Sequence, residues 1–442
     1  MTRPTEDKPA TVPLAQQAGA ARPRWWWVKP SVWTMRMLTT LEQGIEGGRW
    51  FRLFDKVFAE RNLIAAFQQV AQKKGAAGVD HVTVTQFGLA LPESLWEVAD
   101  QLKSGTYQPQ SIRRVHIPKP GTNETRPLGI PTVRDRMVQA AAVNVIEPIF
   151  ERDFAEHSYG FRPGRGCKDA LRRVEALLRD GYTTVVDADL KGYFDSIPHD
   201  RLMSRLKEKI ADGSVLSLIE RFLKANIMDG LEEWSPVTGA PQGAVLSPLL
   251  SNVYLDPLDH LVERSGFKMV RYADDFVILC RTPDEASRAL ALVQTWVAEN
   301  GLTLHPTKTK VVDAWTDGFD FLGYHFEGGT RWPREKSLKK LKDTIRAKTK
   351  RTNGDSLATV ITSLNRTLRG WFEYFKHSRR RTFGRIDGMV RRRLRSLLQH
   401  RAGRRRHGDG YANIRWPTAY FADLGLYSLE QAHALVRQSS RR

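Results

Sequence analysis

Cysteine is nearly absent from this sequence. Only Cys167 and Cys280 occur among 442 residues, and they do not form a CxxC pair. A disulfide framework and a cysteine-based zinc site are therefore both unsupported. This cysteine usage fits a reducing compartment, so we expect a protein of the cytosol.

Long apolar runs are also missing. No stretch of about 18 apolar residues occurs, and the N-terminus lacks the basic-then-apolar pattern of a secretion signal. We therefore expect neither export nor a membrane partner. The 442 residues, 41% of them hydrophobic, are enough for two or three domains with a sizeable core.

Acidic residues are scarce relative to basic ones. Lys and Arg number 69 against 49 Asp and Glu, a net charge of +20, and residues 334–406 alone carry 24 Lys and Arg against five acids. A solvated helix face explains a short basic run such as Lys339-Lys340. It does not explain a long basic segment that also carries Trp371 and Phe372, whereas a nucleic-acid groove does. The sequence thus predicts a polyanionic partner.

Hydrophobic periodicity predicts interleaved helices and strands up to about residue 330. Apolar residues recur at three and four positions between Thr34 and Lys74, which indicates helices. This pattern is typical of an α+β sheet core with helices packed on one face. Further helices are expected at 91–102, 135–150, 167–179 and 285–299, strands at 112–118 and from 183, a hairpin within 268–281, and a turn leading into a strand within 301–314.

The two ends of the chain differ from this core. Residues 1–33 are rich in Pro, Ala, Gln and Thr and are expected to form a flexible arm. Three consecutive tryptophans at 25–27 either dock this arm onto its domain or stack on bases. From 331 to 402 the pattern is helical and basic, and residues 403–442 are expected to form a small separate module.

An acidic pair occurs in the segment VRYADDFVILC, residues 270–280. Asp274 and Asp275 are adjacent at the tip of the predicted hairpin, where their charges repel. Turn formation alone would account for an isolated pair, and a divalent cation that neutralises both is the other explanation. Asp187 and Asp189 lie on one face of the strand in TTVVDADL. If Asp189 faces the hairpin, the carboxylates suit the two Mg²⁺ ions, about 4 Å apart, that nucleotidyl transfer needs.

Several motifs in a fixed order make the likeness to a known family specific. DLKGYFD, APQGAVLSP, YADD, LHPTKTK and FDFLGY follow the order seen in reverse transcriptases, and IPKPGTNETRPLGIPTVRDRMVQ and SYGFRPGRGCKDAL are similar to fingers segments. From about Phe51 to Leu435 the chain resembles a bacterial group II intron-encoded reverse transcriptase, or maturase. The resemblance implies an α+β right-hand polymerase with an N-terminal extension and fingers over 34–180, a palm with an antiparallel sheet over 181–330, an α-helical thumb or maturase domain over 331–402, and a short DNA-binding-like extension over 403–442.

The resemblance also implies roles for individual residues. Asp187 and Asp195 would be bystanders to the catalytic carboxylates. The catalytic residues, which would hold two Mg²⁺ ions with Mn²⁺ as a substitute, would be Asp189, Asp274 and Asp275. The incoming nucleotide would be bound by Lys119, Arg126, Phe194, Gln242 and Lys308. Template and primer would be bound by Arg162, Arg165, Gly243, Phe321, Leu322 and Gly323.

These assignments have plainer alternatives. Lys119, Arg126 and Lys308 could equally be solvated surface charges. Phe194 would stack under the incoming sugar and leave no room for a 2′-hydroxyl, and it could also be an ordinary core aromatic. The two arginines of GFRPGRG would touch template phosphates, or they could belong to a plain loop.

The function implied by the resemblance is that of an RNA-directed DNA polymerase. It would extend a DNA primer with dNTPs on an RNA template, and it would bind group II intron RNA to assist splicing and retrohoming, associating with the nucleoid when it uses target DNA. The alternatives are a related enzyme recruited to host defence or DNA repair, and a non-catalytic RNA-binding splicing factor. The intact set of three Asp argues against the last. Without the cysteines of an endonuclease domain, DNA cleavage is not expected.

Overall fold

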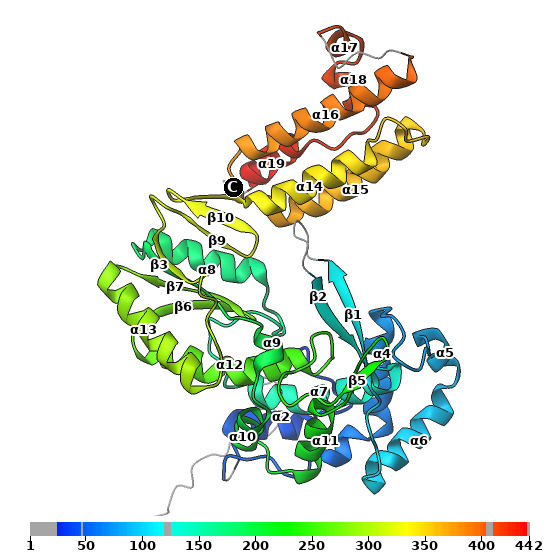
Figure 1. The fold of residues 1–442 in the computed structure, drawn as a ribbon, viewed down its shortest axis with the longest axis vertical. Coiled ribbons are helices and arrows are strands. Elements are labelled where there is room, and N and C mark those ends of the chain that lie inside the picture. The colour runs from blue at the N-terminus through cyan, green and yellow to red at the C-terminus, as the bar shows by residue number, and fades with distance from the viewer. Residues whose placement is uncertain (1–23, 46, 119–124, 404–409, 440–442) are drawn as a thin grey trace, which may run out of the picture. The chain divides into compact units, whose positions relative to one another are not determined.

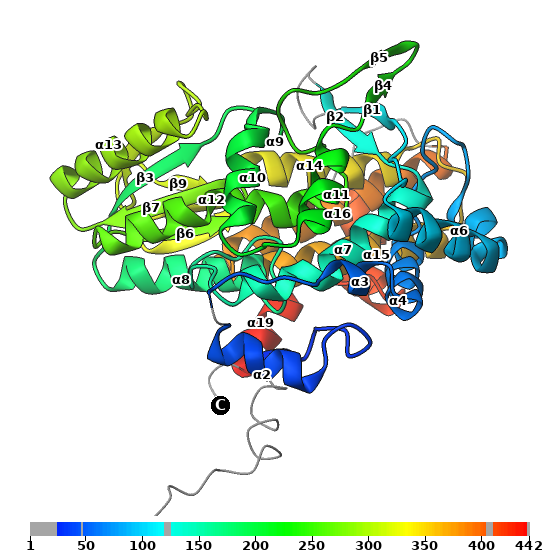
Figure 2. The ribbon, with the colours of Figure 1, turned by 90° about the horizontal axis from the view of Figure 1, so that it is seen from below.

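The computed structural model describes residues 24–45, 47–118, 125–403 and 410–439, and Figures 1 and 2 show it in two views. The chain divides into two compact units. The first comprises residues 1–170, 188–276 and 287–309, and the second comprises residues 171–187, 277–286 and 310–442. The boundary cuts the strands β3 (Thr184–Asp189) and β7 (Asp275–Cys280) and the helices α8 (Cys167–Arg179) and α13 (Pro283–Glu299).

The buried helix α7 (Val133–Glu151) forms the centre of the first unit. It is buried on nearly all sides, including polar residues such as Asp135 and Gln139, as expected of a helix surrounded by protein. Thr132 caps it by accepting a hydrogen bond from the backbone N of Asp135 at 3.1 Å, and α4 (Glu60–Gln72) packs alongside (Figure 2). The unit also contains α2 (Met35–Gln43), α3 (Phe54–Val57), α5 (Val84–Leu89), α6 (Leu91–Ser104), α9 (Tyr193–Ser196), α10 (His199–Lys207), α11 (Gly213–Leu223) and α12 (Ser247–Arg264).

A four-stranded sheet in the first unit has the order β2–β1–β4–β5. The strands β1 (Ile112–Pro118) and β2 (Thr125–Ile130) pair antiparallel. The strand β4 (Ile227–Asp229) runs parallel to β1 and pairs antiparallel with β5 (Glu232–Trp234). The strand expected over 112–118 is therefore confirmed.

The sheet that carries the acidic motifs has the order β6–β7–β3–β8. The strands β6 (Lys268–Tyr272) and β7 form the predicted hairpin, with Ala273 and Asp274 between them. The strand β8 (Lys310–Asp313) pairs antiparallel with β3, and α12 packs against β6. The fold is thus a mixture of helices and largely antiparallel sheets, followed by a helical C-terminal region, as the sequence predicts.

The second unit continues with a small sheet and a bundle of long helices. The sheet has the order β11–β10–β9 and is antiparallel; its strands are β9 (Phe319–Phe321), β10 (Tyr324–Glu327) and β11 (Thr330–Pro333). The helices α14 (Glu335–Lys348), α15 (Leu357–Phe375) and α16 (Arg381–Arg401) lie side by side (Figure 1). Their apolar faces share one core, whereas basic side chains such as Lys336, Lys339 and Lys340 of α14 are exposed.

The prediction of a separate module after residue 403 is wrong. The helices α17 (Gly410–Arg415), α18 (Thr418–Asp423) and α19 (Leu429–Ser439) contribute Trp416, Phe421 and Leu429 to the core of α14–α16. The Asp387 carboxylate on α16 also accepts hydrogen bonds from the backbone N atoms of Leu429 and Glu430, both at 3.1 Å, at the start of α19. Residues 410–439 are therefore part of the helical bundle, because its apolar surface needs them as a cover.

The tryptophan run at 25–27 is anchored at its first member. Trp25 is buried, and its Nε1 donates to Glu42 at 2.6 Å, whereas Trp26 is exposed. Docking thus accounts for Trp25. The flexible arm expected for residues 1–33 lies largely outside the described residues. In the part of the chain that the structure describes, no helix has the length and apolarity needed to cross a membrane.

Candidate active site

The turn that carries Asp274 has a left-handed backbone. Ala273 has φ +59°, a conformation that residues with a side chain adopt only when their surroundings impose it. Gly160 packs against the Ala273 backbone so closely that a Cβ on Gly160 would overlap it. The Asn252 side chain on α12 holds Gly160 in place by donating to its carbonyl at 2.8 Å. The segment before the GFRPGRG arginines therefore forms one wall of the hairpin.

Arg271 on β6 supports the same turn from inside the protein. Its buried guanidinium forms a two-point ion pair with Asp259 of α12, with Nε donating to Oδ1 at 2.7 Å. Its Nη1 also donates to the Ala273 carbonyl and to Asn252 Oδ1, both at 2.9 Å. The hairpin tip is thus tied to α12 by a charged network in which the Arg271 donors and the Asp259 acceptors satisfy each other.

Asp189 is the last residue of β3, in the strand beside the Asp274 hairpin. Its carbonyl accepts a hydrogen bond from the His305 backbone N at 2.7 Å, so the segment LHPTK runs along the end of β3. The Lys308 Nζ of that segment lies 2.6 Å from Asp189 Oδ2, and the Lys308 side chain remains mostly exposed. Lys308 and Asp189 therefore form an ion pair.

The charge of Asp189 affects the pKa of Asp274, so the two carboxylates belong to one site. Burial raises the pKa of Asp274 above its usual value, and the nearby charge of Asp189 raises it further, whereas Arg126 and Arg271 lower it. Arg126, exposed on β2, is thus close enough to act on the same carboxylate. Asp275 begins β7 and is half-buried.

The carboxylates do not form a complete metal cluster in this arrangement. Among the described residues, no three His, Cys, Asp or Glu side chains lie close enough together to hold a metal ion. The chemistry of the donors nevertheless fits one. Mg²⁺ binds through a few carboxylates and completes its shell with waters and phosphates, and a cation would relieve the repulsion that raises the pKa of Asp274. The roles of Asp189, Asp274 and Asp275 as ligands remain a prediction.

The segment that contains Gln242 and Gly243 docks onto β2. The Gln242 carbonyl accepts a hydrogen bond from the Gly129 backbone N at 2.7 Å. Gly243 has φ +109°, and a Cβ there would overlap the Gly129 carbonyl and the Leu128 side chain. Gly243 is therefore required by this packing, and its contact with template remains a prediction.

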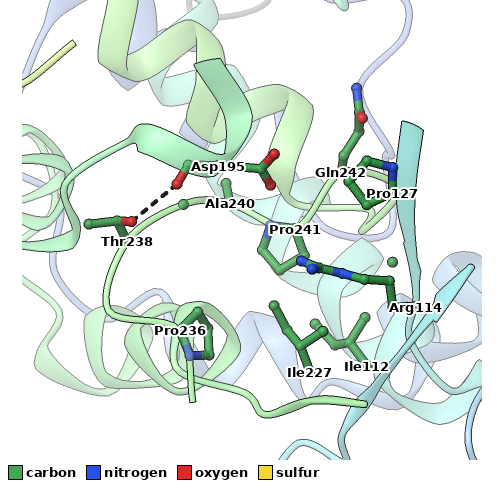
Figure 3. A pocket seen from close by; sticks show the side chains of 12 residues that line it. Ile112, Arg114, Pro127, Asp195, Ile227, Pro236, Thr238, Ala240, Pro241 and Gln242 are labelled. Atoms are coloured by element: carbon green, nitrogen blue, oxygen red, sulfur yellow. Dashed lines mark hydrogen bonds between the residues drawn. The ribbon is translucent and has the colours of Figure 1, made fainter. Parts of the chain in front are cut away.

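Phe194 is bonded to the same short loop that carries Gln242. Phe194 on α9 is buried, and its carbonyl accepts from the Ala240 backbone N at 2.7 Å. Gln242, with Asp195 and Arg114, lines a cavity of about 30 Å³ (Figure 3), room for about two water molecules. Asp195, expected to be a bystander, borders Gln242 there.

The template role expected for Arg162 is corrected by the structure. Its buried guanidinium pairs with Glu151 at 2.8 Å and donates to the carbonyls of Ala155 and Ser158 at 2.5 and 2.9 Å. These bonds hold the guanidinium inside its own loop, where it is buried away from a phosphate. Arg165 is half-buried and donates to the Glu156 carbonyl, so its contact with template remains a prediction.

The primer-binding role expected for FLG is corrected in part. The Phe321 side chain is buried in the second unit, so it cannot touch a primer. The Leu322 carbonyl accepts from the Tyr374 hydroxyl at 2.7 Å, and the Gly323 carbonyl accepts from the Arg334 backbone N at 2.9 Å. Leu322 and Gly323 are half-buried and remain candidates. Lys119 lies outside the described residues.

Sequence reasoning missed the residues that hold the hairpin. Arg271 lies in a quoted motif, Asn252 follows one, and Asp259 lies between two of them, but none was assigned a role. An arginine inside an otherwise apolar strand was the available signal, since a buried charge requires a partner.

Comparison with known proteins identifies the family. Residues 117–326 match the reverse transcriptase (RNA-dependent DNA polymerase) profile, and residues 338–412 match the maturase-specific domain of group II introns. Protein YkfC of Escherichia coli (strain K12) is 36% identical over 303 residues, which cover 59% of this chain and 79% of YkfC. The chain belongs to the group II intron reverse transcriptase and maturase family. This family uses divalent metal ions and has nucleic-acid partners. The mixed fold of helices and antiparallel sheets with a helical C-terminal region, expected from the sequence, is confirmed.

Other members of the reverse transcriptase and maturase family match over shorter shares of their length. Group II intron-encoded protein LtrA of Lactococcus lactis subsp. cremoris is 38% identical over 206 residues, 47% of this chain. The match spans about a third of LtrA, 34% of its length. Among solved structures, a chain of a partial Cas6-RT-Cas1–Cas2 complex is 28% identical, covering 56% of this chain and 41% of that one, with a TM-score of 0.37. A score that low supports no statement about fold.

Proposed function

We propose that this protein is an RNA-directed DNA polymerase that extends a primer with dNTPs on an RNA template. The observation that supports this most directly is the electrostatic coupling of Asp274 to Asp189 and to Arg126. Carboxylates close enough to influence one another, beside exposed cations, are what a site for a metal-bound triphosphate requires. A module that only binds RNA has no use for negative charge at this position.

Asp189 and Asp274, with Asp275 beside them, would hold the divalent ions, which we propose to be two Mg²⁺. When bound, these ions supply activation of the primer 3′-hydroxyl and stabilisation of the leaving pyrophosphate. Arg271 and Gly160 hold the turn that presents Asp274, so the carboxylate needs little rearrangement to bind a metal.

The cations around the carboxylates would bind the triphosphate. Arg126 is exposed on β2 and can offer its guanidinium fork to phosphate oxygens. Lys308 pairs with Asp189 at 2.6 Å. Its mostly exposed ammonium would donate a hydrogen bond to the departing pyrophosphate.

Phe194 and Gln242 would complete the nucleotide site. Phe194 offers an aromatic ring without a polar group, so a 2′-hydroxyl packed against it would be left without a hydrogen-bond partner. Gln242, fixed through its backbone to β2, would contact the nucleotide or the template base. Both roles rest on the family resemblance together with the docking of these segments.

The basic helical bundle would bind RNA, both the template–primer duplex and group II intron RNA during splicing. Its exposed lysines on α14 lie outside a closed apolar core. An A-form duplex is recognised through its backbone and shape rather than its base sequence. A helical surface rich in Lys and Arg suits that mode of binding.

The experiment that tests this function is primer extension on an RNA template with dNTPs and Mg²⁺. The wild-type protein should extend the primer, and Asp274→Ala should abolish extension while RNA binding survives. Asp284→Ala, at an exposed position on α13, is the matched control and should extend normally. A wild-type protein that binds the duplex but adds no nucleotide would refute the proposal.

A further inference from the structure

Phe161 is an aromatic residue held in an unfavourable backbone conformation at the protein surface. Its φ is +59°, and its side chain is 46% exposed. A bulky residue in the left-handed region costs stability. Because the ring is partly exposed, its burial offsets little of that cost. Packing inside the protein therefore uses only part of the surface of this residue.

The backbone on both sides of Phe161 is fixed by internal bonds. Before it, Gly160 packs against the Ala273 backbone and accepts a hydrogen bond from Asn252 at 2.8 Å. After it, Arg162 is buried and bound to Glu151 at 2.8 Å. The ring is therefore presented by a rigid segment, which is how a binding residue is kept ready for its ligand.

The ring also adjoins two parts of the candidate active site. The Phe161 and Phe194 rings meet edge to face, with centroids 6.5 Å apart and an interplanar angle of 75°. The adjacent Gly160 packs against Ala273, the residue before Asp274. An exposed aromatic ring thus lies beside both the residue expected to contact the sugar and the hairpin expected to hold the metal.

We propose that Phe161 is a second aromatic wall of the nucleotide pocket, packing against the sugar and base of the incoming deoxynucleotide. This inference rests on the proposed polymerase function. An aromatic face binds the apolar surface of any base, so the contact contributes affinity without selecting a sequence. Through its edge contact, Phe161 also holds the Phe194 ring in position, so that both rings exclude a 2′-hydroxyl.

The test is single-nucleotide incorporation by Phe161 variants on an RNA template–primer. Phe161→Ala should raise KM for dNTP by about ten-fold, the size expected for the loss of one stacking contact on a base. It should change kcat by less, and it should lower the preference for dNTP over rNTP. Phe161→Tyr keeps the ring and should retain a KM close to wild type. Trp96→Ala, which removes a ring that is 70% exposed on α6, is the matched control and should leave KM unchanged.

A glycine variant separates binding from folding. Phe161→Gly relieves the left-handed strain, so its thermal stability should be at least that of Phe161→Ala, yet its KM for dNTP should rise as much. A residue needed only for structure would lose stability and activity together. Measuring the dissociation constant of the template–primer for each variant shows whether the ring binds the duplex rather than the incoming nucleotide.

The outcomes distinguish this inference from the proposed function. Normal incorporation by wild type, with KM for dNTP unchanged in Phe161→Ala and Phe161→Gly, would overturn the inference alone. A weaker template–primer complex with unchanged KM would also overturn it and would assign the ring to the duplex. No incorporation by wild type would overturn the polymerase proposal and this inference with it.

Discussion

Replacing Arg271 with Met should destabilise the protein severely, because it leaves a buried carboxylate without its partner. Arg271 and Asp259 are both buried and form a two-point ion pair. Breaking such a pair by removing one member costs about 3–5 kcal/mol, most of it the penalty for the charge left behind. Losing the donor to the Ala273 carbonyl should add about 1–3 kcal/mol if that carbonyl stays buried and unpaired.

The double variant Arg271→Met with Asp259→Leu separates stability from positioning. It contains no unpaired buried charge, so it should recover most of the lost unfolding free energy. It should not recover primer extension, because the Ala273 carbonyl still lacks its donor and the turn that presents Asp274 is no longer held. Urea unfolding followed by tryptophan fluorescence and primer extension on the same preparations measure the two effects.

The matched control is Arg264→Met, at an exposed arginine on α12, which should cost less than about 1 kcal/mol. Two results would refute the reasoning. One is a loss in Arg271→Met no larger than in this control. The other is a double variant that extends primers at the wild-type rate, since the network would then have no part in placing the catalytic turn.

Three further predictions concern pH, an ion pair and salt. Burial and the charge of Glu151 raise the pKa of Glu147 to about 7. Because the folded protein binds this proton more tightly than the unfolded chain does, the protein loses stability as the proton dissociates with rising pH. The unfolding free energy should therefore fall by about 3 kcal/mol between about pH 4.5 and 7. Unfolding of Glu147→Gln at pH 5 and pH 8 should lack that fall, and the exposed control Glu299→Gln should keep it. Lys308→Met should tighten Mn²⁺ binding, because Asp189 loses a competing partner, yet lower kcat; weaker Mn²⁺ binding would contradict this. RNA affinity should drop steeply between 50 and 200 mM salt as phosphate contacts release counterions, and a flat response would contradict a basic RNA-binding surface.

Local patterns in the sequence were sufficient to predict the main elements of the site. The hairpin at Ala273 and Asp274 was predictable because two short apolar runs flank a polar tip. The strand ending at Asp189 was predictable from its β-branched residues. That these two carboxylates would meet followed from the order of the motifs and the family resemblance, and could not be read from either segment alone.

The inward direction of Arg162 could not be predicted from its motif. Glycines beside an arginine suggest a loop that approaches phosphates, but here Arg162 turns toward Glu151 and two carbonyls of its own loop. Whether an arginine points outward depends on acceptors that only the fold assembles. Phe161, beside the buried arginine, is an exposed member of that loop.

The packing of residues 410–439 against the helical bundle was not predicted, for a related reason. Trp416, Phe421 and Leu429 do not recur with a helical period, so their shared core is not visible in the sequence. The bundle supplies the apolar surface that they cover, and Asp387 on α16 supplies the acceptors for the start of α19. Less basic composition was mistaken for a domain boundary.

The most direct measurement of the central claim is RNA-templated primer extension in Mg²⁺ by wild type and by Asp274→Asn at equal RNA occupancy. Asn keeps the size of the side chain and removes its charge, and relief from burying that charge should leave the variant folded and at least as stable at neutral pH. The account predicts full occupancy and no extension by the variant. Extension at the wild-type rate would show that the Asp274 carboxylate does not serve catalysis and would contradict the account.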